Sequence, residues 1–148
     1  MKVHVDKTQS RFKRVRDGNG SRTGIGEFFL LLSITAKDTA LYIPLSIASG
    51  KKPTGFVYHI EGTAEGMIST TDISVRGEGV TQLTLGTILY AKIPVGKTAV
   101  FRLLIEMRGK VGKTYGIVIN RINYKHNPSD ARYQKYLQEI PTKTVKFD

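Results

Sequence analysis

The 148-residue sequence contains no cysteine and no tryptophan. The absence of cysteine excludes disulfide bonds, thiolate nucleophiles, iron–sulfur clusters and cysteine-bound zinc. Acidic residues are also scarce: 12 Asp and Glu stand against 23 Lys and Arg, and the formal net charge is +11. A charge of this sign attracts nucleic acid, anionic glycans, teichoic-type polymers or acidic membrane surfaces, and it carries no information about the fold.

Long apolar runs are missing too. The longest, at residues 28–32, has five residues, whereas a membrane-spanning helix needs about 20. The first ten residues, MKVHVDKTQS, lack the apolar stretch of a secretory signal, so we expect either a cytosolic chain or a mature or cloned part of an exported one. The length and the 40% apolar content suit one soluble domain with a sizeable core.

Most of the chain alternates apolar and polar residues with period two, which is typical of strands with one buried face. The clearest case is TAVFRLLIEMR at residues 98–108. In GEFFLLLSITA, Phe29 and Leu31 make the second face partly apolar as well. The pattern also predicts strands in GFVYHIE, TQLTLGTIL, TYGIVINRINY, ALYIPL, MISTTDISV and TKTVKF. A one-residue slip near Asn120 and Arg121 predicts a β-bulge.

Turn signals rich in glycine, proline and lysine separate these strands. Seven or eight strands at short intervals predict an all-β fold, namely a single antiparallel immunoglobulin-like β-sandwich. One segment differs, because SDARYQKYLQEI places Tyr133, Tyr136 and Ile140 at spacings of three and four. Residues 129–140 are therefore expected to form either a short helix or an ordered loop.

Three stretches resemble the immunoglobulin-like modules of bacterial surface proteins. IPVGKTAVFRLLIEM has a Pro-x-Gly-Lys-Thr turn that leads into an alternating strand. GEFFLLLSITAKDTALYIPLS is similar to their first long strand, turn and second strand, and GKTYGIVINRINY is similar to their penultimate strand. The resemblance covers residues 24–148. It implies a non-catalytic spacer, adhesive or assembly module at the cell surface or outside the cell, with no shared functional site.

No catalytic or metal-binding motif stands out. The histidines, His4, His59 and His126, lie far apart and match no metal-binding spacing. GKT at 96–98 and at 112–114 carries only the end of a phosphate-binding loop and precedes strands, so both are interpreted as turns. We therefore expect no enzymatic activity, no catalytic residue, no metal and no cofactor.

Basic residues are concentrated at the N-terminus. Residues 1–23 contain seven of them and two acids, and we interpret this segment as a basic arm in front of a β-sandwich domain at 24–148. DGNG at residues 17–20 is a turn signal that would fold the arm into a hairpin with the next strand. The candidate contact residues are five cations and one aromatic anchor: Arg11, Phe12, Lys13, Arg14, Arg16 and Arg22.

The arm has three alternative roles. It is a solvated leader or a strand of its own domain, a strand lent to another copy in a homo-oligomer or filament, or a contact for an anionic polymer. Nucleic acid, as in a capsid-like protein, is the alternative partner. A second basic–aromatic cluster, in which Tyr124, Tyr133 and Tyr136 neighbour Lys and Arg residues, is consistent with that alternative. The sequence thus predicts a structural or binding module.

Overall fold

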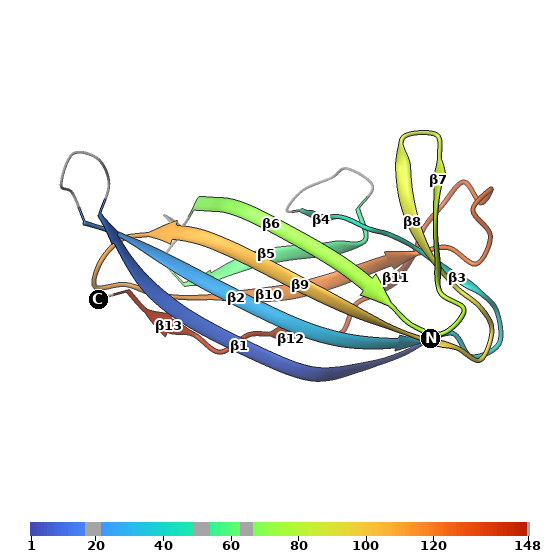
Figure 1. The fold of residues 1–148 in the computed structure, drawn as a ribbon, viewed down its shortest axis with the longest axis horizontal. Helices are drawn as coiled ribbons and strands as arrows, with labels where there is room; N and C mark the ends of the chain where they lie inside the picture. Colours follow the sequence, from blue (N-terminus) through green and yellow to red (C-terminus); the bar gives the residue numbers. More distant parts are fainter. Residues whose placement is uncertain (17–21, 49–53, 63–66, 148) are drawn as a thin grey trace.

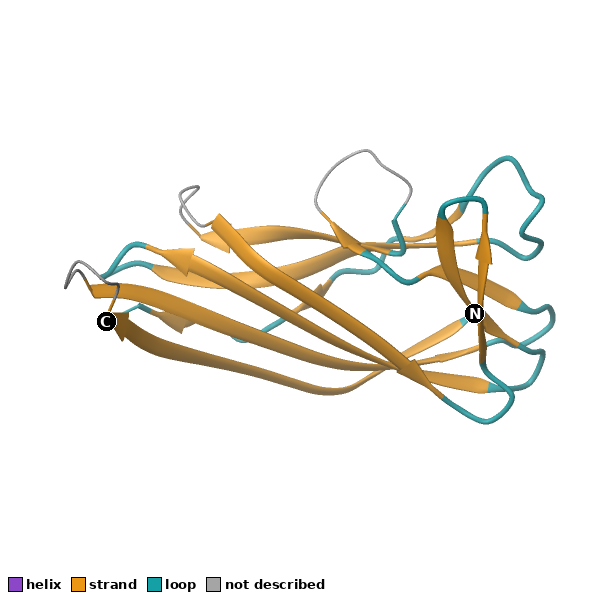
Figure 2. Cartoon of the chain, turned by 45° about the horizontal axis from the view of Figure 1, so that its top comes forward, coloured by secondary structure: helices purple, strands orange, loops and turns teal. Residues whose placement is uncertain are grey.

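A computed structural model of the chain describes residues 1–16, 22–48, 54–62 and 67–147. Within these ranges the protein consists of strands and loops (Figure 2), and no helix that could cross a membrane is found there. The strands are β1 (Lys2–Arg16), β2 (Arg22–Thr35), β3 (Leu41–Pro44), β4 (Ile47–Ala48), β5 (Phe56–Gly62), β6 (Met67–Arg76), β7 (Thr81–Leu85), β8 (Ile88–Ile93), β9 (Thr98–Gly109), β10 (Thr114–Tyr124), β11 (Gln134–Tyr136), β12 (Ile140–Pro141) and β13 (Val145–Lys146).

The strands form three sheets (Figure 1). Sheet A has the order β1–β2–β9–β6. Sheet C has the order β11–β10–β5–β4, and β12 and β13 also pair with β10. Sheet B is smaller and has the order β3–β8–β7. The strand pairs are antiparallel except β4–β5, which is parallel. The chain therefore has the all-β, mainly antiparallel architecture that its alternating pattern predicts.

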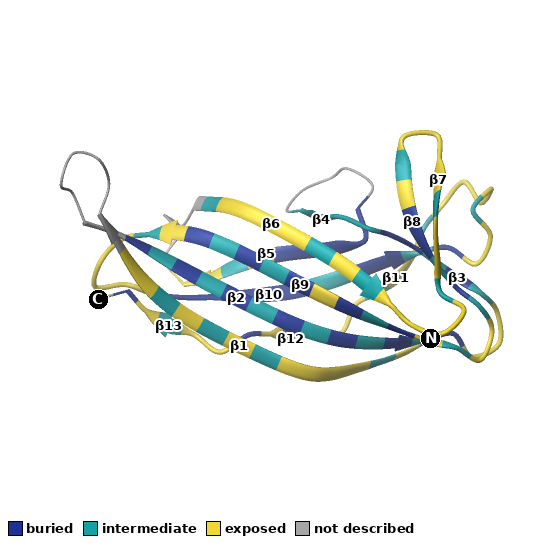
Figure 3. Ribbon diagram, in the orientation of Figure 1, coloured by how far each residue is buried: buried dark blue, intermediate teal, exposed yellow. Residues whose placement is uncertain are grey.

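Sheets A and C face each other across the core. On the inner face of sheet A, Leu30 of β2 pairs directly with Leu103 of β9, and both side chains are fully buried. Phe56 of β5 meets Phe101 of β9 between the two sheets, with ring centroids 5.2 Å apart. Figure 3 shows the resulting alternation of buried and half-buried residues along β2 and β9. One face of each long strand thus supplies the core.

Several details of the sequence prediction are confirmed. The β5–β10 register shifts between Ile119 and Arg121, where the one-residue slip predicts a bulge. Gly96 and Gly112, in the two GKT segments, have φ of +78° and +88°, and each precedes a strand. These positive values belong to turns and favour glycine.

The prediction of one strand over TQLTLGTIL is wrong. Leu85 pairs with Ile88, so this segment is the end of β7, a two-residue turn and the start of β8. Gly86 occupies the first turn position with φ of +63°, which matches a type II′ hairpin turn. The alternation runs on through so short a turn, and for this reason it hides the reversal.

The helix alternative for residues 129–140 is also wrong. Tyr136 pairs with Ile122, and Ile140 pairs with Ile119, so β11 and β12 extend along the edge of β10. Tyr133 is held by a hydrogen bond between its hydroxyl and that of Tyr90, at 2.9 Å. Strand pairing and this tertiary contact replace the helix that the three-and-four spacing suggests.

Residues 2–16 of the basic arm form strand β1. Its register with β2 runs from Lys2 opposite Thr35 to Arg16 opposite Arg22, so the hairpin expected from the sequence is confirmed. The DGNG turn itself lies outside the described residues. The expected boundary between residues 23 and 24 falls inside β2. Residues 2–16 are therefore an edge strand of sheet A.

An aromatic cluster, defined as Phe12, Tyr115 and Phe147, closes one end of the molecule. The ring of Phe147 lies 5.1 Å from that of Phe12 and 4.7 Å from that of Tyr115. These rings cover Gly24 and Gly109, which pair across β2 and β9. A Cβ atom on Gly109 would lie 2.5 Å from the Tyr115 ring and 2.6 Å from Phe147. Glycine is thus needed here to admit the rings.

Candidate functional site

The outer face of sheet A, which points away from the core, carries the features that stand out chemically. Alternation along the strands sends every second side chain of β2 and β9 to this face. The strand register then sets neighbours in rows across the sheet. One row contains, from β1 to β6, the residues Lys7, Leu31, Arg102 and Ser74.

A shallow groove of about 390 Å³ lies on this face. Phe29, Leu31 and Val100 supply its apolar part, and all three are half-buried. Lys7 on β1, Arg76 on β6 and Arg102 on β9 supply positive charge. The residues that line it, which we call the sheet A groove, are Lys7, Phe29, Leu31, Ser74, Val75, Arg76, Val100 and Arg102.

The charge of the sheet A groove is not compensated within the described part of the chain. None of Lys7, Arg76 and Arg102 forms an ion pair there, and no acidic residue lines the groove. The guanidinium of Arg102 lies 5.3 Å from the ring centroid of Phe29. This cation–π contact holds the Arg102 side chain against the apolar part and leaves its charge unneutralised.

Two of the predicted arm cations lie at one end of the same face. Arg11 and Lys13 both pair with Glu27, at Nη2–Oε2 and Nζ–Oε1 distances of 2.6 Å and 2.5 Å. The hydrogen bond from Lys13, and next that from Arg11, lowers the pKa of the Glu27 carboxyl. Two positive charges therefore share Glu27, whose register partner on β9 is a second carboxylate, Glu106.

The other predicted contact residues are not gathered with them. Phe12 points inward and packs on Phe147, so it anchors β1 to its own domain. Arg14 is exposed, and its register partner is Gly24. Arg16 and Arg22 are register partners at the end of the β1–β2 pairing next to residues 17–21, and their side chains lie outside the described part of the structure. The arm thus divides into an anchor and a cationic rim.

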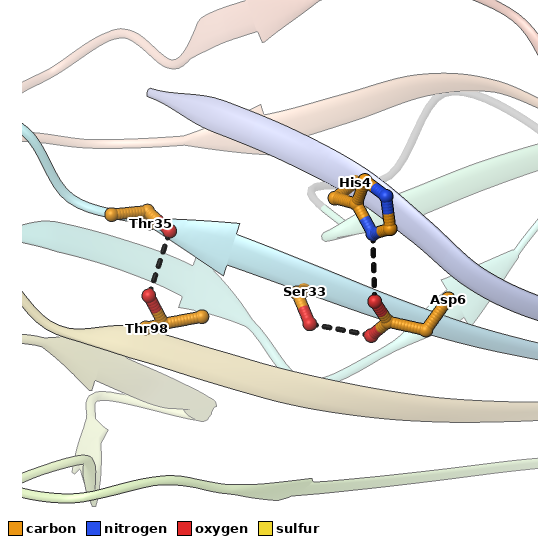
Figure 4. A network of polar contacts seen from close by, with 5 residues as sticks. All are labelled: His4, Asp6, Ser33, Thr35 and Thr98. Carbon is orange, nitrogen blue, oxygen red and sulfur yellow. Dashed lines mark hydrogen bonds and ion pairs between the residues drawn. The ribbon is translucent and has the colours of Figure 1, made fainter.

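A polar network occupies the opposite end of β1 (Figure 4). Asp6 is at a bulge in β1 and accepts hydrogen bonds from Ser33 Oγ and from His4 Nδ1, the latter at 2.7 Å. The bond from Ser33, and next that from His4, lowers the pKa of the Asp6 carboxyl. Ser33 donates to Asp6 and not to His4, so the imidazole is not positioned to take a proton from this hydroxyl. The network therefore fixes the bulge and has no nucleophile–base geometry.

The remaining histidines lie elsewhere. His59 is exposed on β5, and His126 Nδ1 contacts Thr39 Oγ1 at 2.5 Å. Among the described residues, no group of three His, Cys, Asp or Glu side chains is arranged to hold a metal ion.

The predicted second basic–aromatic cluster is divided by the fold. Tyr124 and Tyr136 are half-buried against the core. Tyr133 alone of the three tyrosines meets a lysine in the described structure, since Lys125 Nζ lies 4.5 Å from its ring centroid. Sequence reasoning missed the sheet A groove, although the apolar second face of β2 signals it.

Comparison of the chain with protein-family models, with curated proteins and with solved structures found no match. Function is therefore inferred from the geometry of the site.

Proposed function

We propose that this protein is a non-catalytic, immunoglobulin-like β-sandwich module that binds an anionic polymer across the outer face of sheet A. The strand order supports the fold assignment. An immunoglobulin constant-type domain has strands A-B-E-D in one sheet and C-F-G in the other. In chain order, β1, β2, β9 and β6 take the places of A, B, E and D, and β5, β10 and the C-terminal strands take those of C, F and G.

The sheet A groove is the observation that carries the binding function. Three strands that are far apart in sequence each contribute one cation without an ion-pair partner in the described chain. Strands in a sheet lie about 4.8 Å apart, so the four strands of sheet A span roughly 15 Å. A chain of regularly spaced anionic groups that crosses the strands would meet these cations in succession, and its apolar parts would cover Phe29 and Leu31.

The aromatic content of the face favours an anionic glycan or glycopolymer over nucleic acid. Proteins that bind single-stranded nucleic acid stack successive bases on several exposed aromatic rings. The groove contains one aromatic residue, Phe29, and Arg102 already lies over its ring. Charge is thus present without a stacking platform.

The edges of sheet A support binding more than strand exchange between copies. β1 is one edge strand, and it combines basic residues with the bulge at Asp6. β6 is the other edge strand, and its register shifts between Ile68 and Thr70. Charges and bulges on edge strands oppose the pairing of additional strands. We therefore assign the arm to the binding face and not to an inter-subunit strand.

The test compares two polyanions of equal charge by fluorescence anisotropy: a labelled sulfated oligosaccharide and a labelled single-stranded oligonucleotide. We expect the oligosaccharide to bind at low ionic strength and to bind progressively more weakly as sodium chloride displaces it. Tighter binding of the oligonucleotide would instead support the nucleic-acid alternative. Absence of binding by both polymers at low salt would refute the proposal.

The Glu27→Gln substitution is expected to strengthen polymer binding. It removes the shared counter-charge of Arg11 and Lys13 and frees both cations on the outer face. We expect affinity for the sulfated oligosaccharide to rise about threefold at low salt. Glu78→Gln is the matched control, because it makes the same change in net charge where Glu78 pairs with Lys97. Equal affinities of the two variants would show that total charge, and not this face, determines binding.

Acid is expected to destabilise the fold through Asp6 and Glu27. The pKa of each carboxyl is lowered in the folded state. Each group therefore contributes stability above its ordinary pKa, and this contribution is lost as the pH falls through the lowered value. The melting temperature should fall between about pH 5 and about pH 2, and Glu27→Gln should reduce the steepness of that fall. An unchanged pH profile in the variant would show that the ion pairs of Glu27 do not contribute.

A further inference from the structure

A second cationic site lies on sheet B and the adjoining end of β10, apart from the sheet A groove. It consists of two lysines and three tyrosines, which we call the lysine–tyrosine ring. Its members come from β3, β8, the residue after β10 and the loop that follows. They are Tyr42, Tyr90, Lys92, Lys125 and Tyr133.

Three contacts and the strand register bring these side chains together. Lys125 Nζ lies 4.5 Å from the ring centroid of Tyr133, and the hydroxyls of Tyr133 and Tyr90 are 2.9 Å apart. Lys92 is two residues beyond Tyr90 on β8, so both side chains point to the same face. Lys92 Nζ in turn lies 5.8 Å from the ring centroid of Tyr42.

The strand register places the two lysines on either side of Tyr42. Tyr42 pairs with Lys92 of β8 on one side. On its other side it forms an isolated bridge with Lys125, in which the two backbones exchange hydrogen bonds of 2.8 Å and 2.9 Å. The two lysines are thus two strand spacings apart, about 10 Å between their Cα atoms, on either side of one tyrosine. Lysine side chains are long enough for both ammonium groups to approach a single group held above Tyr42.

These ammonium groups lack a counter-charge within the described chain. Neither Lys92 nor Lys125 forms an ion pair there. Lys125 is nevertheless 91% buried, with an exposed fraction of 9%. The stem of Lys125 is therefore packed, while its ammonium group reaches solvent beside the ring of Tyr133. An anion from solution would supply the missing charge.

The hydroxyl groups favour the same kind of ligand. Tyr90 and Tyr133 share one hydrogen bond, so the second hydroxyl proton stays available to donate. Burial, and next the bond with Tyr90, raises the pKa of Tyr133, which keeps this phenol protonated. The ring therefore offers six ammonium protons and two phenolic protons, one from the Tyr90–Tyr133 pair and one from Tyr42, and it matches a group whose oxygens only accept.

We propose that the lysine–tyrosine ring binds a single tetrahedral oxyanion, either a phosphate or a sulfate group. Such a group has oxygens on several sides, and both lysines can donate to it at once while a tyrosine hydroxyl contacts a third oxygen. The site is independent of polymer binding on sheet A. It would recognise a terminal phosphate or sulfate on a small molecule or at the end of a chain.

The experiment is an NMR titration of the full chain with inorganic phosphate, inorganic sulfate and, at matched ionic strength, sodium chloride. Saturable shifts centred on Tyr42, Lys92 and Lys125 are expected with phosphate or sulfate and not with chloride. The anion whose titration saturates at the lower concentration is the preferred ligand. Shifts that are the same with chloride and spread over all lysines would overturn the proposal.

Two substitutions localise the site. Lys92→Gln is expected to weaken oxyanion binding about tenfold, because it removes one charge-assisted contact. Lys125→Met should weaken it similarly while the apolar side chain preserves packing, so a folding defect is avoided. Lys113→Gln is the matched control for a cation elsewhere. Arg102→Gln changes the sheet A groove and should leave oxyanion affinity unchanged. The oxyanion proposal and the polymer proposal are therefore tested independently of each other. Wild-type affinity in both lysine variants would refute the assignment.

Discussion

Replacement of Phe147 by alanine is expected to lower the free energy of unfolding by about 3–5 kcal/mol, the usual cost of removing a buried phenylalanine from a core. The side chain is fully buried and contacts both Phe12 and Tyr115. Its loss leaves a cavity over Gly24 and Gly109, neither of which has a side chain to fill the space. Urea unfolding followed by tyrosine fluorescence or circular dichroism gives the value directly.

Phe29→Ala is the matched control for this measurement. Phe29 lies on the outer face of sheet A and is half-buried, so its removal opens no enclosed cavity. We expect the free energy of unfolding to fall by about 1 kcal/mol, because the half-buried Phe29 side chain contributes less buried apolar area than Phe147 does. If the two variants were equally stable, the aromatic cluster would not hold the N-terminal strand in place.

The triple substitution Lys7→Gln, Arg76→Gln and Arg102→Gln is expected to reduce affinity for the sulfated oligosaccharide between about tenfold and a hundredfold at low salt. Each cation lines the sheet A groove and lacks an ion-pair partner in the described chain. Its removal therefore deletes a contact with the polymer and breaks no ion pair. The slope of log K against log salt should become shallower by about one for each cation that contacts the polymer.

A control with the same change in net charge separates the site from a general charge effect. Lys113, Lys143 and Lys146 are exposed and lie in or beside the strands of sheet C. Their joint replacement by glutamine should change affinity less than threefold and leave the salt slope nearly intact. Similar losses in both triple variants would mean that the polymer responds to net charge alone. The groove would then have no special role.

Local pattern is enough to predict the strands but not their partners. Alternation identifies β2 and β9 because one face of each faces the core along its whole length. It fails at Gly86, where a two-residue turn preserves the alternation, and at Tyr133, whose position depends on a hydroxyl from β8. Both errors concern contacts between segments, which a single-sequence pattern does not contain.

The candidate site is harder to predict for the same reason. The sequence shows Arg11 and Lys13 as unopposed charges, because Glu27 comes beside them only through the β1–β2 register. It also shows Phe12 as a free anchor, although its partner Phe147 is near the other end of the chain. The cations of the sheet A groove come from β1, β6 and β9, and no spacing along the chain links them. Site prediction here needs the strand order.

The contact between β1 and residues 143–147 has a consequence for biosynthesis. Ser10 Oγ donates to the carbonyl oxygen of Lys143, 133 residues away, and Phe12 is covered by Phe147. A nascent chain therefore carries β1 while residues 143–147, which cover it, are still to be synthesised. Such sequence-distant contacts form slowly. We expect the domain to reach its final packing only when residues 143–147 are available to close over β1.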